Sequence, residues 1–385
     1  MLWGLAKGMS IKAVLVLEDG SVWYGKGFGA VREVVGEVVF TTGMVGYPEA
    51  LTDPSYYGQI LTFTYPLIGN YGVPPYDMVD EFKLPLHFES HGVKVWGVVV
   101  HEVCQHPSHW SSVKSLHEWL LEENVPGIYG IDTRALTYKL RERGVMMGLL
   151  KVYHEGEDID EEKLYQKLAK ATRYGEEDLV KYVTVKEPIV HRPKKTVARI
   201  VLMDCGVKLG IIRELLKRGL EVIRVPYDTD VSQVLELKPQ GVLVSNGPGD
   251  PKKLDKTIET VRELMKLNMP VFGICLGNQI LALAAGGDTY KMKYGHRGQN
   301  KPCIDLTTGR SYVTSQNHGY AVKPEGLKDL GFRVWFINAD DKTVEGIAHL
   351  NKPVFATQFH PEASPGPYDT LWVFDLFVKE VLKSG

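Results

Sequence analysis

Hydrophobic and polar positions in the C-terminal half of the chain alternate between two patterns. Short continuous apolar runs, such as 199–203 and 220–225, are typical of buried strands, whereas residues 208–218 place apolar side chains at helical spacing. Strands that alternate with amphipathic helices form parallel sheets with helices on both faces. We therefore predict a mainly parallel, doubly wound α/β sheet, with further strands at 241–245 and 271–274 and further helices at 255–267 and 276–285.

The N-terminal half has short strand-like runs separated by turns. The run at 13–17 ends in Glu18-Asp19-Gly20, which is a turn signal. Gly144 follows a helical periodicity at 134–143 and is a typical C-terminal cap. We predict a compact, strand-rich α+β domain, with further strands at 34–41, 60–65 and 95–101 and a further helix at 113–122.

Two prolines and little periodicity mark residues 186–195 as an interdomain linker. Residues 155–177, before the linker, are dense in charge and helical in pattern, which predicts a solvated surface helix. We place the two domains at 1–190 and 191–385.

Composition narrows the class of protein. Hydrophobic residues make up 44% and charged residues 24%, as in ordinary globular proteins, and 385 residues suit two or three domains. The net charge of −2 gives no general field for nucleic acid or a membrane surface, and no apolar run reaches the ~18 residues that cross a bilayer. Four widely spaced cysteines favour a reducing cytoplasm. Residues 1–10 lack the apolar segment of a signal peptide, and Met9 is an alternative start to Met1.

Ligand sites of doubly wound sheets lie at the carboxyl ends of the strands. At one such end, Cys275 stands where a predicted strand runs directly into a predicted helix, with Gly273 and Gly277 on either side. This is the arrangement of a nucleophile elbow, with sulfur in place of the serine oxygen. The glycines leave room for a tight turn, and the helix N-terminus carries about half a positive charge, which favours a thiolate. The alternative is a buried structural cysteine between two packing glycines.

A second strand end carries His360, which follows the apolar run 354–356, and Glu362 comes two residues later. An imidazole can take and return a proton near neutral pH, and a carboxylate that accepts its other N–H fixes the tautomer. With Cys275, these residues supply the parts of an activated-nucleophile triad. A lone histidine after a strand is more often structural, but this pairing in a chain with an elbow cysteine favours catalysis.

The third candidate is the turn at 245–251, which contains Gly247 and Gly249 and follows a predicted strand. Glycines there let backbone N–H groups approach a ligand closely, as donors to an oxyanion do. The backbone N–H of Leu276, next to the elbow cysteine, is a second candidate donor. The plainer interpretation is an ordinary Gly/Pro turn.

These three segments resemble the class I glutamine amidotransferase family, in which they occur in the same order. The resemblance implies that Cys275 attacks the side-chain amide of glutamine and that His360 protonates the departing ammonia. Water activated through His360 would then hydrolyse a γ-glutamyl thioester, with Glu362 orienting the imidazole.

The rest of the chain is similar to the small-subunit family of carbamoyl-phosphate synthase. The similarity lies in segments 37–47, 51–56, 64–72, 130–137, 140–144 and 315–322. It implies a glutaminase subunit that passes ammonia through a tunnel to a large synthetase subunit, for arginine and pyrimidine synthesis. No P-loop motif occurs in this chain. ATP, Mg²⁺ and bicarbonate are therefore expected on the large subunit, and this chain is expected to hold no cofactor and no metal.

The resemblance also implies which residues bind L-glutamine: Ser55, Gly247, Gly249, Leu276, Gln279, Asn317, Gly319 and Tyr320. Ser55 would reach across from the N-terminal domain, so that the site would lie at the domain interface. By sequence chemistry alone, Ser55 is better explained as a turn cap after Asp53-Pro54.

The chain departs from the family pattern at a few positions. Asn278 stands where many relatives carry histidine, Tyr320 where phenylalanine is common, and Pro48 where glutamine is common. None of these removes a triad residue. Residues 71–92 fit the pattern only loosely.

Other interpretations are weaker. His101, Cys104, His106 and His109 lie close together in the sequence but lack the second ligand pair of a zinc site, and His87 and His91 lack the glutamate of a zinc-protease helix. A stand-alone cysteine hydrolase and an inert scaffold subunit remain alternatives. Assays with other amides test the first, and the intact triad argues against the second.

Overall fold

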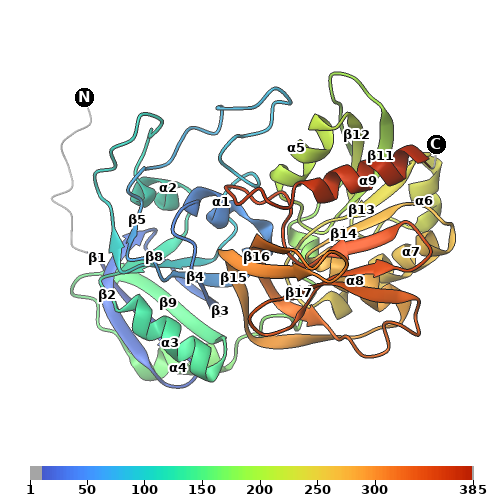
Figure 1. Ribbon diagram of the computed structural model, residues 1–385. Helices are drawn as coiled ribbons and strands as arrows, with labels where there is room; N and C mark the ends of the chain where they lie inside the picture. The colour runs from blue at the N-terminus through green and yellow to red at the C-terminus, as the bar shows by residue number, and fades with distance from the viewer. Residues whose placement is uncertain (1–10, 384–385) are drawn as a thin grey trace. The chain divides into compact units, whose positions relative to one another are not determined.

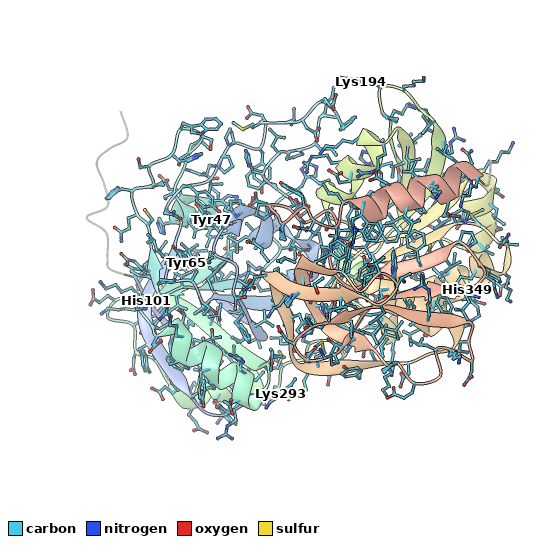
Figure 2. All side chains as sticks on the ribbon, viewed as in Figure 1. Tyr47, Tyr65, His101, Lys194, Lys293 and His349 are labelled. Atoms are coloured by element: carbon cyan, nitrogen blue, oxygen red, sulfur yellow. The ribbon has the colours of Figure 1, made fainter. Side chains whose placement is uncertain are left out.

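The computed structural model describes residues 11–383 of the chain. Residues 1–10 and 384–385, and with them the choice between Met1 and Met9, lie outside the described part. The described chain forms two compact units (Figure 1). The first comprises residues up to Leu51 together with 58–75 and 92–174, and the second comprises the remaining residues. Side chains fill the interior of each unit, whereas Lys194 projects from the surface (Figure 2).

The first unit is built on a closed β-barrel. Residues 13–17 are all buried, because one face of their strand lines the barrel and the other is covered by α4 (Glu161–Ala169). Leu164 and Leu168 of α4 belong to the same buried cluster as Val14, so the predicted surface helix has a buried face. Around the barrel the strands follow the order β1 (Ile11–Leu17), β2 (Val22–Gly29), β8 (Pro126–Tyr129), β6 (Gly97–Val99), β4 (Gln59–Phe63), β3 (Glu33–Thr41) and β9 (Met146–His154).

Short helices and a small sheet complete this unit. Ser115 caps α2 (Leu116–Glu122) in a capping box with Glu118, and Gly144 at a φ of 101° ends α3 (Thr133–Arg143) as predicted. The other elements are α1 (Tyr47–Thr52), whose last residue belongs to the second unit, and the paired strands β5 (Leu67–Ile68) and β7 (Glu102–Val103).

The second unit contains one mixed sheet, to which ten strands of the described chain contribute. Its centre is the predicted parallel arrangement, in the order β12 (Leu220–Pro226), β11 (Ala198–Asp204), β13 (Gly241–Val244), β14 (Val271–Ile274) and β19 (Val354–Thr357). The sequence did not predict the antiparallel extension, which runs β18 (Val344–His349), β16 (Ser311–Val322), β15 (Thr289–Asp305) and β17 (Phe332–Asn338).

Helices cover both faces of this sheet, which confirms the predicted α/β class. Alternate residues of β11 enter different buried clusters, since Met203 packs with the helices on one face and Leu202 with those on the other. The first face carries α6 (Val231–Glu236), α7 (Asp255–Lys266) and α8 (Leu276–Ala285), and the second carries α5 (Leu209–Lys217) and α9 (Trp372–Lys383) (Figure 1).

The predicted linker is partly a strand. Within it, β10 (Ile189–His191) pairs antiparallel with β12 at the sheet edge. Residues 175–190 therefore pack with the second unit. The predicted boundary between 190 and 191 assigned these residues to the first domain instead.

Two earlier segments of the first predicted domain also belong to the second unit, namely 52–57 and 76–91. Arg213 of α5 donates a 2.7 Å hydrogen bond to Asp80 and a 2.6 Å bond to the carbonyl of Pro85. Such contacts between distant parts of the chain leave no local signal in the sequence.

Among the described residues, the helices are all too short or too polar to span a lipid bilayer.

The packing of α8 on the sheet predicts the effect of a small substitution. A β-carbon at Gly277 would lie 2.1 Å from the carbonyl oxygen of Val244 in β13. We expect Gly277→Ala to lower the free energy of unfolding by about 1–3 kcal/mol, the usual cost of overpacking an interior. Urea denaturation measures this change. A β-carbon at Gly366 would meet nothing within 4 Å, so Gly366→Ala is the control, and equal stability of the two variants would contradict the close approach.

Candidate active site

Cys275 lies at a strained turn between β14 and α8. Its backbone has a φ of 56° and a ψ of −102°, a conformation that costs a residue with a β-carbon about 1–3 kcal/mol and that is concentrated at functional sites. The backbone N–H of Cys275 donates to the carbonyl of Thr357 at 2.8 Å, which ties the turn to β19. The predicted elbow is therefore present in the fold.

The glycines around the elbow allow backbones to approach closely. A β-carbon at Gly273 would lie 2.6 Å from the backbone of Gly277. At the next strand end, a β-carbon at Gly247 would lie 2.0 Å from the carbonyl oxygen of Cys205. Larger residues at these positions would push the turn and the helix away from the sheet.

His360 and Glu362 follow β19 and are both buried. His360 Nδ1 lies 2.6 Å from Glu362 Oε1, and His360 Nε2 has no hydrogen-bond partner among residues 11–383. Burial is the largest single influence and lowers the pKa of His360, but Glu362 and Cys275 together outweigh it and raise the pKa to about 10. The carboxylate thus holds one ring nitrogen and leaves the other for the thiol.

Lys208 is a site residue that the sequence analysis missed. Its Nζ is buried at the end of β11, 3.0 Å from Glu362 Oε1 and 2.9 Å from the carbonyl oxygen of Ala363. Burial raises the pKa of Glu362, but the charges of Lys208 and His360 outweigh burial and lower it to about 2. A signal existed, because Lys208 is the N-cap of α5, where a cation opposes the helix dipole.

The predicted oxyanion donors lie at two neighbouring strand ends. Leu276 is the first residue of α8, so its backbone N–H has no acceptor within the helix. Gly249 has a φ of 88°, which glycine adopts readily. The backbone N–H of Leu276 thus lies directly after Cys275 at the start of α8, and the oxyanion role of both segments stays a prediction.

Several of the predicted glutamine contacts form one hydrogen-bond network. The Cys275 thiol donates to the carbonyl oxygen of Asn317 at 3.6 Å. Gln279 Nε2 donates to the carbonyl oxygen of Tyr320 at 2.9 Å, and Asn278 bonds to Gln358 at 3.1 Å. Gly319 lies between Asn317 and Tyr320 on β16. These contacts place residues of α8 and β16 together around the thiol.

Ser55 belongs to the same compact unit as the elbow. It lies in a 3₁₀ turn, Pro54–Tyr56, where its backbone N–H donates to Asp53 Oδ1 at 2.9 Å. Its Oγ accepts a 2.9 Å hydrogen bond from Asn246 Nδ2, and Asp53 Oδ2 accepts one from Asn317 Nδ2 at the same distance. Both interpretations of Ser55 are therefore compatible with the structure, and Asp53 joins the network although the sequence analysis did not select it.

The cysteine and histidine residues that the sequence analysis weighed as zinc ligands, around Cys104, do not form the metal-like cluster of the structure. Among residues 11–383, the cluster whose ligand atoms lie close enough for a metal is His296, His318 and Glu345. The set around Cys104 has no such geometry in the described chain.

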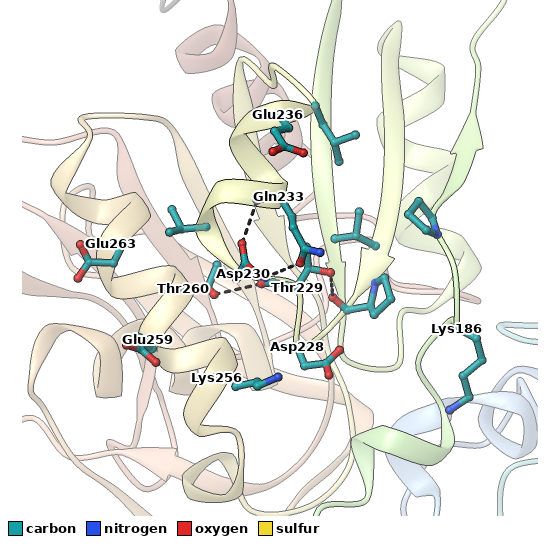
Figure 3. Close-up of a pocket in the computed structure, with 15 residues that line it drawn as sticks. Lys186, Asp228, Thr229, Asp230, Gln233, Glu236, Lys256, Glu259, Thr260 and Glu263 are labelled. Carbon is teal, nitrogen blue, oxygen red and sulfur yellow. Dashed lines mark hydrogen bonds between the residues drawn. The ribbon is translucent and has the colours of Figure 1, made fainter.

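A surface pocket of about 850 Å³ lies elsewhere on the second unit (Figure 3). The charged residues in its lining are five carboxylates and two lysines: Asp228, Asp230, Glu236, Glu259, Glu263, Lys186 and Lys256. None of the predicted site residues lines this pocket. We therefore take the strand ends around Cys275, and not this pocket, as the candidate active site.

Two family models match the chain. Residues 201–380 match "Glutamine amidotransferase class-I", and residues 15–150 match "Carbamoyl-phosphate synthase small chain, CPSase domain". The chain is 52% identical over 373 residues to the carbamoyl phosphate synthase small chain of Pyrococcus furiosus, covering 97% of this chain and 98% of the relative. It is 51% identical over 369 residues to that of Methanocaldococcus jannaschii, covering 96% and 99%. The chain therefore belongs to the carbamoyl-phosphate synthase small-chain family and contains a class I glutamine amidotransferase domain.

Proposed function

We propose that this chain hydrolyses L-glutamine to glutamate and ammonia, with Cys275 as nucleophile, His360 as acid and base, and Glu362 as the residue that orients His360. The observation that carries this proposal is the strained elbow of Cys275 beside an imidazole whose Nδ1 is 2.6 Å from a buried carboxylate. A structural cysteine does not need a left-handed backbone at a strand end.

The reaction proceeds in two halves. His360 takes the proton of the Cys275 thiol as the sulfur attacks the side-chain amide carbon, and the oxyanion that forms is stabilised by backbone N–H groups of Leu276 and the Gly247–Gly249 turn. His360 gives a proton to the departing ammonia as the carbon–nitrogen bond breaks. His360 then takes a proton from water, which attacks the thioester, and glutamate and the free thiol are released.

Lys208 assists by holding Glu362 in its ionised form. Without a nearby cation, burial would favour the protonated carboxyl, which cannot accept the His360 N–H as strongly. We assign Lys208 to positioning, because its Nζ contacts Glu362 and Ala363 and not the thiol.

We further propose that the ammonia passes to a large synthetase chain that makes carbamoyl phosphate for arginine and pyrimidine synthesis. Support comes from the relatives, which are named small chains and which this chain matches over almost its full length. ATP, Mg²⁺ and bicarbonate would be bound by that partner. All four cysteines are free thiols, which suits the reducing cytoplasm in which we place the reaction.

The nucleophile is tested by Cys275→Ser. We expect this variant to lose glutamine hydrolysis by at least about 10³-fold, because a serine oxygen is a poorer nucleophile in this setting. With the large chain present, synthesis from added ammonia should remain. Ammonia release from glutamine and carbamoyl phosphate formation are the two assays.

Cys104→Ser is the matched control and should hydrolyse glutamine at the parental rate, since Cys104 lies in the other compact unit. Continued hydrolysis by Cys275→Ser would exclude Cys275 as the nucleophile.

The buried lysine predicts a change in acid stability. Glu362 ionises with a pKa lowered to about 2, so its contribution to stability is complete above the unfolded pKa near 4 and is lost as the pH falls through about 2. Lys208→Met removes the cation, so this loss should begin at higher pH. We also expect lower stability at pH 7, by at most about 3–5 kcal/mol, because the buried carboxylate of Glu362 loses one of its two basic partners.

Circular dichroism during acid and urea titrations measures both effects. Lys217→Met is the control, since its ion pair with Glu214 is half-exposed on the lysine side and should contribute less than about 1 kcal/mol. An unchanged acid transition in Lys208→Met would contradict the assigned role.

A further inference from the structure

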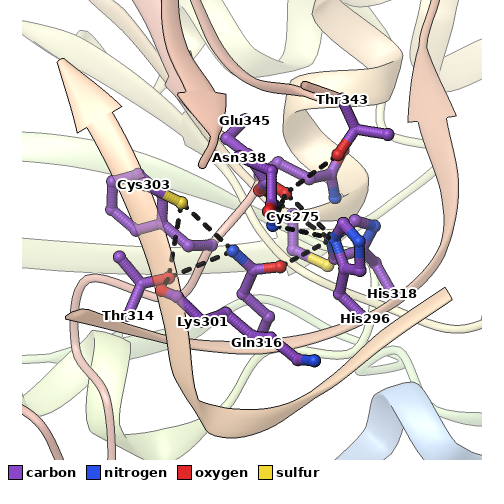
Figure 4. Close-up of polar contacts among 12 residues, drawn as sticks. Cys275, His296, Lys301, Cys303, Thr314, Gln316, His318, Asn338, Thr343 and Glu345 are labelled. Atoms are coloured by element: carbon purple, nitrogen blue, oxygen red, sulfur yellow. Dashed lines mark hydrogen bonds and ion pairs between the residues drawn. The ribbon is translucent and has the colours of Figure 1, made fainter. Parts of the chain in front are cut away.

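A second buried polar cluster lies close to Cys275, in the antiparallel part of the sheet (Figure 4). It contains His296 on β15, Glu345 on β18, Asn338 at the end of β17, and Asp341 in the turn between β17 and β18. The mechanism above uses none of them. Glu345 is fully buried, and a buried carboxylate requires compensating partners.

His296 contacts a carboxylate through each ring nitrogen. Nδ1 lies 3.0 Å from Glu345 Oε1, and Nε2 lies 2.9 Å from Asp341 Oδ2. A neutral imidazole has one N–H, so two carboxylate acceptors favour the doubly protonated ring. Burial lowers the pKa of His296, but the hydrogen bonds to Asp341 and Glu345 outweigh burial and raise it to about 9. Burial also raises the pKa of Glu345, and the hydrogen bond and charge of His296 oppose this rise. His296 and Glu345 thus form a buried hydrogen-bonded pair in which each offsets part of the effect of burial on the other.

The other oxygen of Glu345 lies toward β16. Oε2 has no hydrogen-bond partner among the described residues and is 3.8 Å from His318 Nε2. The rings of His296 and His318 are in edge-to-face contact, with centroids 5.1 Å apart. His318 stands between Asn317 and Gly319, so the pair contacts the segment 317–320 that is predicted to bind glutamine.

Backbone pairing of this segment is irregular on either side of Asn317 and His318, which themselves pair with Arg297 and His296 of β15. β16 pairs with β18 in register only at Val322 and Val344. On its other side, the pairing of β16 with β15 shifts register both before His296 and after Gly298. Side-chain contacts therefore add to the constraint that this pairing places on the segment.

We propose that His296 and Glu345 are a positioning pair that holds the segment 317–320 in its glutamine-binding position. The pair acts through the ring of His318 and does not touch the reacting atoms. This inference rests on the proposed glutaminase function, because it names what positions the substrate-binding segment of that site.

A metal ion held by His296, His318 and Glu345 is the competing interpretation, since their ligand atoms lie within 4.8 Å of one another. A histidine ligand must present a nitrogen without a proton. Both nitrogens of His296 already contact carboxylates, which favours the hydrogen-bonded pair.

Several neighbouring groups affect the pKa of His296, and their own protonation therefore has to be considered when binding is measured against pH. Asp341 and Glu345 bond to it directly, and His318 faces it from β16. The remaining titratable or charged groups that interact with these three residues are Tyr290, Arg297, Cys303 and His360.

Glutamine binding by isothermal titration calorimetry tests the proposal in the Cys275→Ser chain, which binds without turnover. Adding Glu345→Gln keeps the shape of the side chain and removes its charge, and we expect the Kd for glutamine to rise about tenfold or more. In the otherwise parental enzyme with its partner, KM should rise while kcat stays within about twofold. A general loss of structure would lower kcat as well.

Two further measurements separate positioning from a merely structural role. Glu214→Gln, which removes a largely buried carboxylate paired with Arg218 at 2.6 Å, is the matched control and should leave the Kd unchanged. In the Cys275→Ser chain, glutamine binding should weaken as the pH rises through about 9, where His296 loses its charge. In Asp341→Asn this loss should occur at lower pH.

Parental Kd and KM in Glu345→Gln would overturn the proposal, as would a fall in kcat with KM unchanged. One equivalent of metal in the purified chain, lost in His296→Gln, would also overturn it in favour of a metal site. The proposed glutaminase mechanism has its own test, because it would be wrong if the Cys275→Ser chain still hydrolysed glutamine.

Discussion

The register of the parallel strands is the constraint on which the active site depends. Met203, Val244, Gly273 and Ala356 form one row across β11, β13, β14 and β19. The residues that follow each of them therefore emerge at the same edge of the sheet. Cys275 needs this edge because its backbone N–H is bound to Thr357, three residues before His360. A slip of one residue would turn every side chain of a strand to the opposite face.

Buried charges of opposite sign are paired at this edge. Glu362 contacts both His360 and Lys208, so one carboxylate is matched by two basic groups in a water-poor interior. Glu345 and Asp341 contact His296 in a comparable way in the antiparallel part of the sheet. In both clusters a carboxylate fixes the protonation and the orientation of an imidazole. Removing either partner leaves an uncompensated charge, which costs more than the pair contributes.

Local patterns in the sequence predicted the features that depend on neighbouring residues. The elbow needs a strand, two glycines and a helix in succession, and the sequence displays all of them around Cys275. The closure of the barrel and the antiparallel extension depend on pairings between distant strands, for which β15, with its lysines and bulges, carries no clear alternation. Lys208 and Asp53 were missed for the same reason, because each enters the site through a partner far away in the sequence.

In the mechanism that we propose, the glutamyl group of glutamine is bound covalently to Cys275 before water releases it. Rapid acid quenching of the enzyme during turnover, followed by peptide mass spectrometry, measures this directly. We expect a γ-glutamyl group on the peptide that contains Cys275, and we expect it to be absent when glutamine is omitted. Ammonia release without any glutamyl group on Cys275, or with the group on another residue, would contradict it.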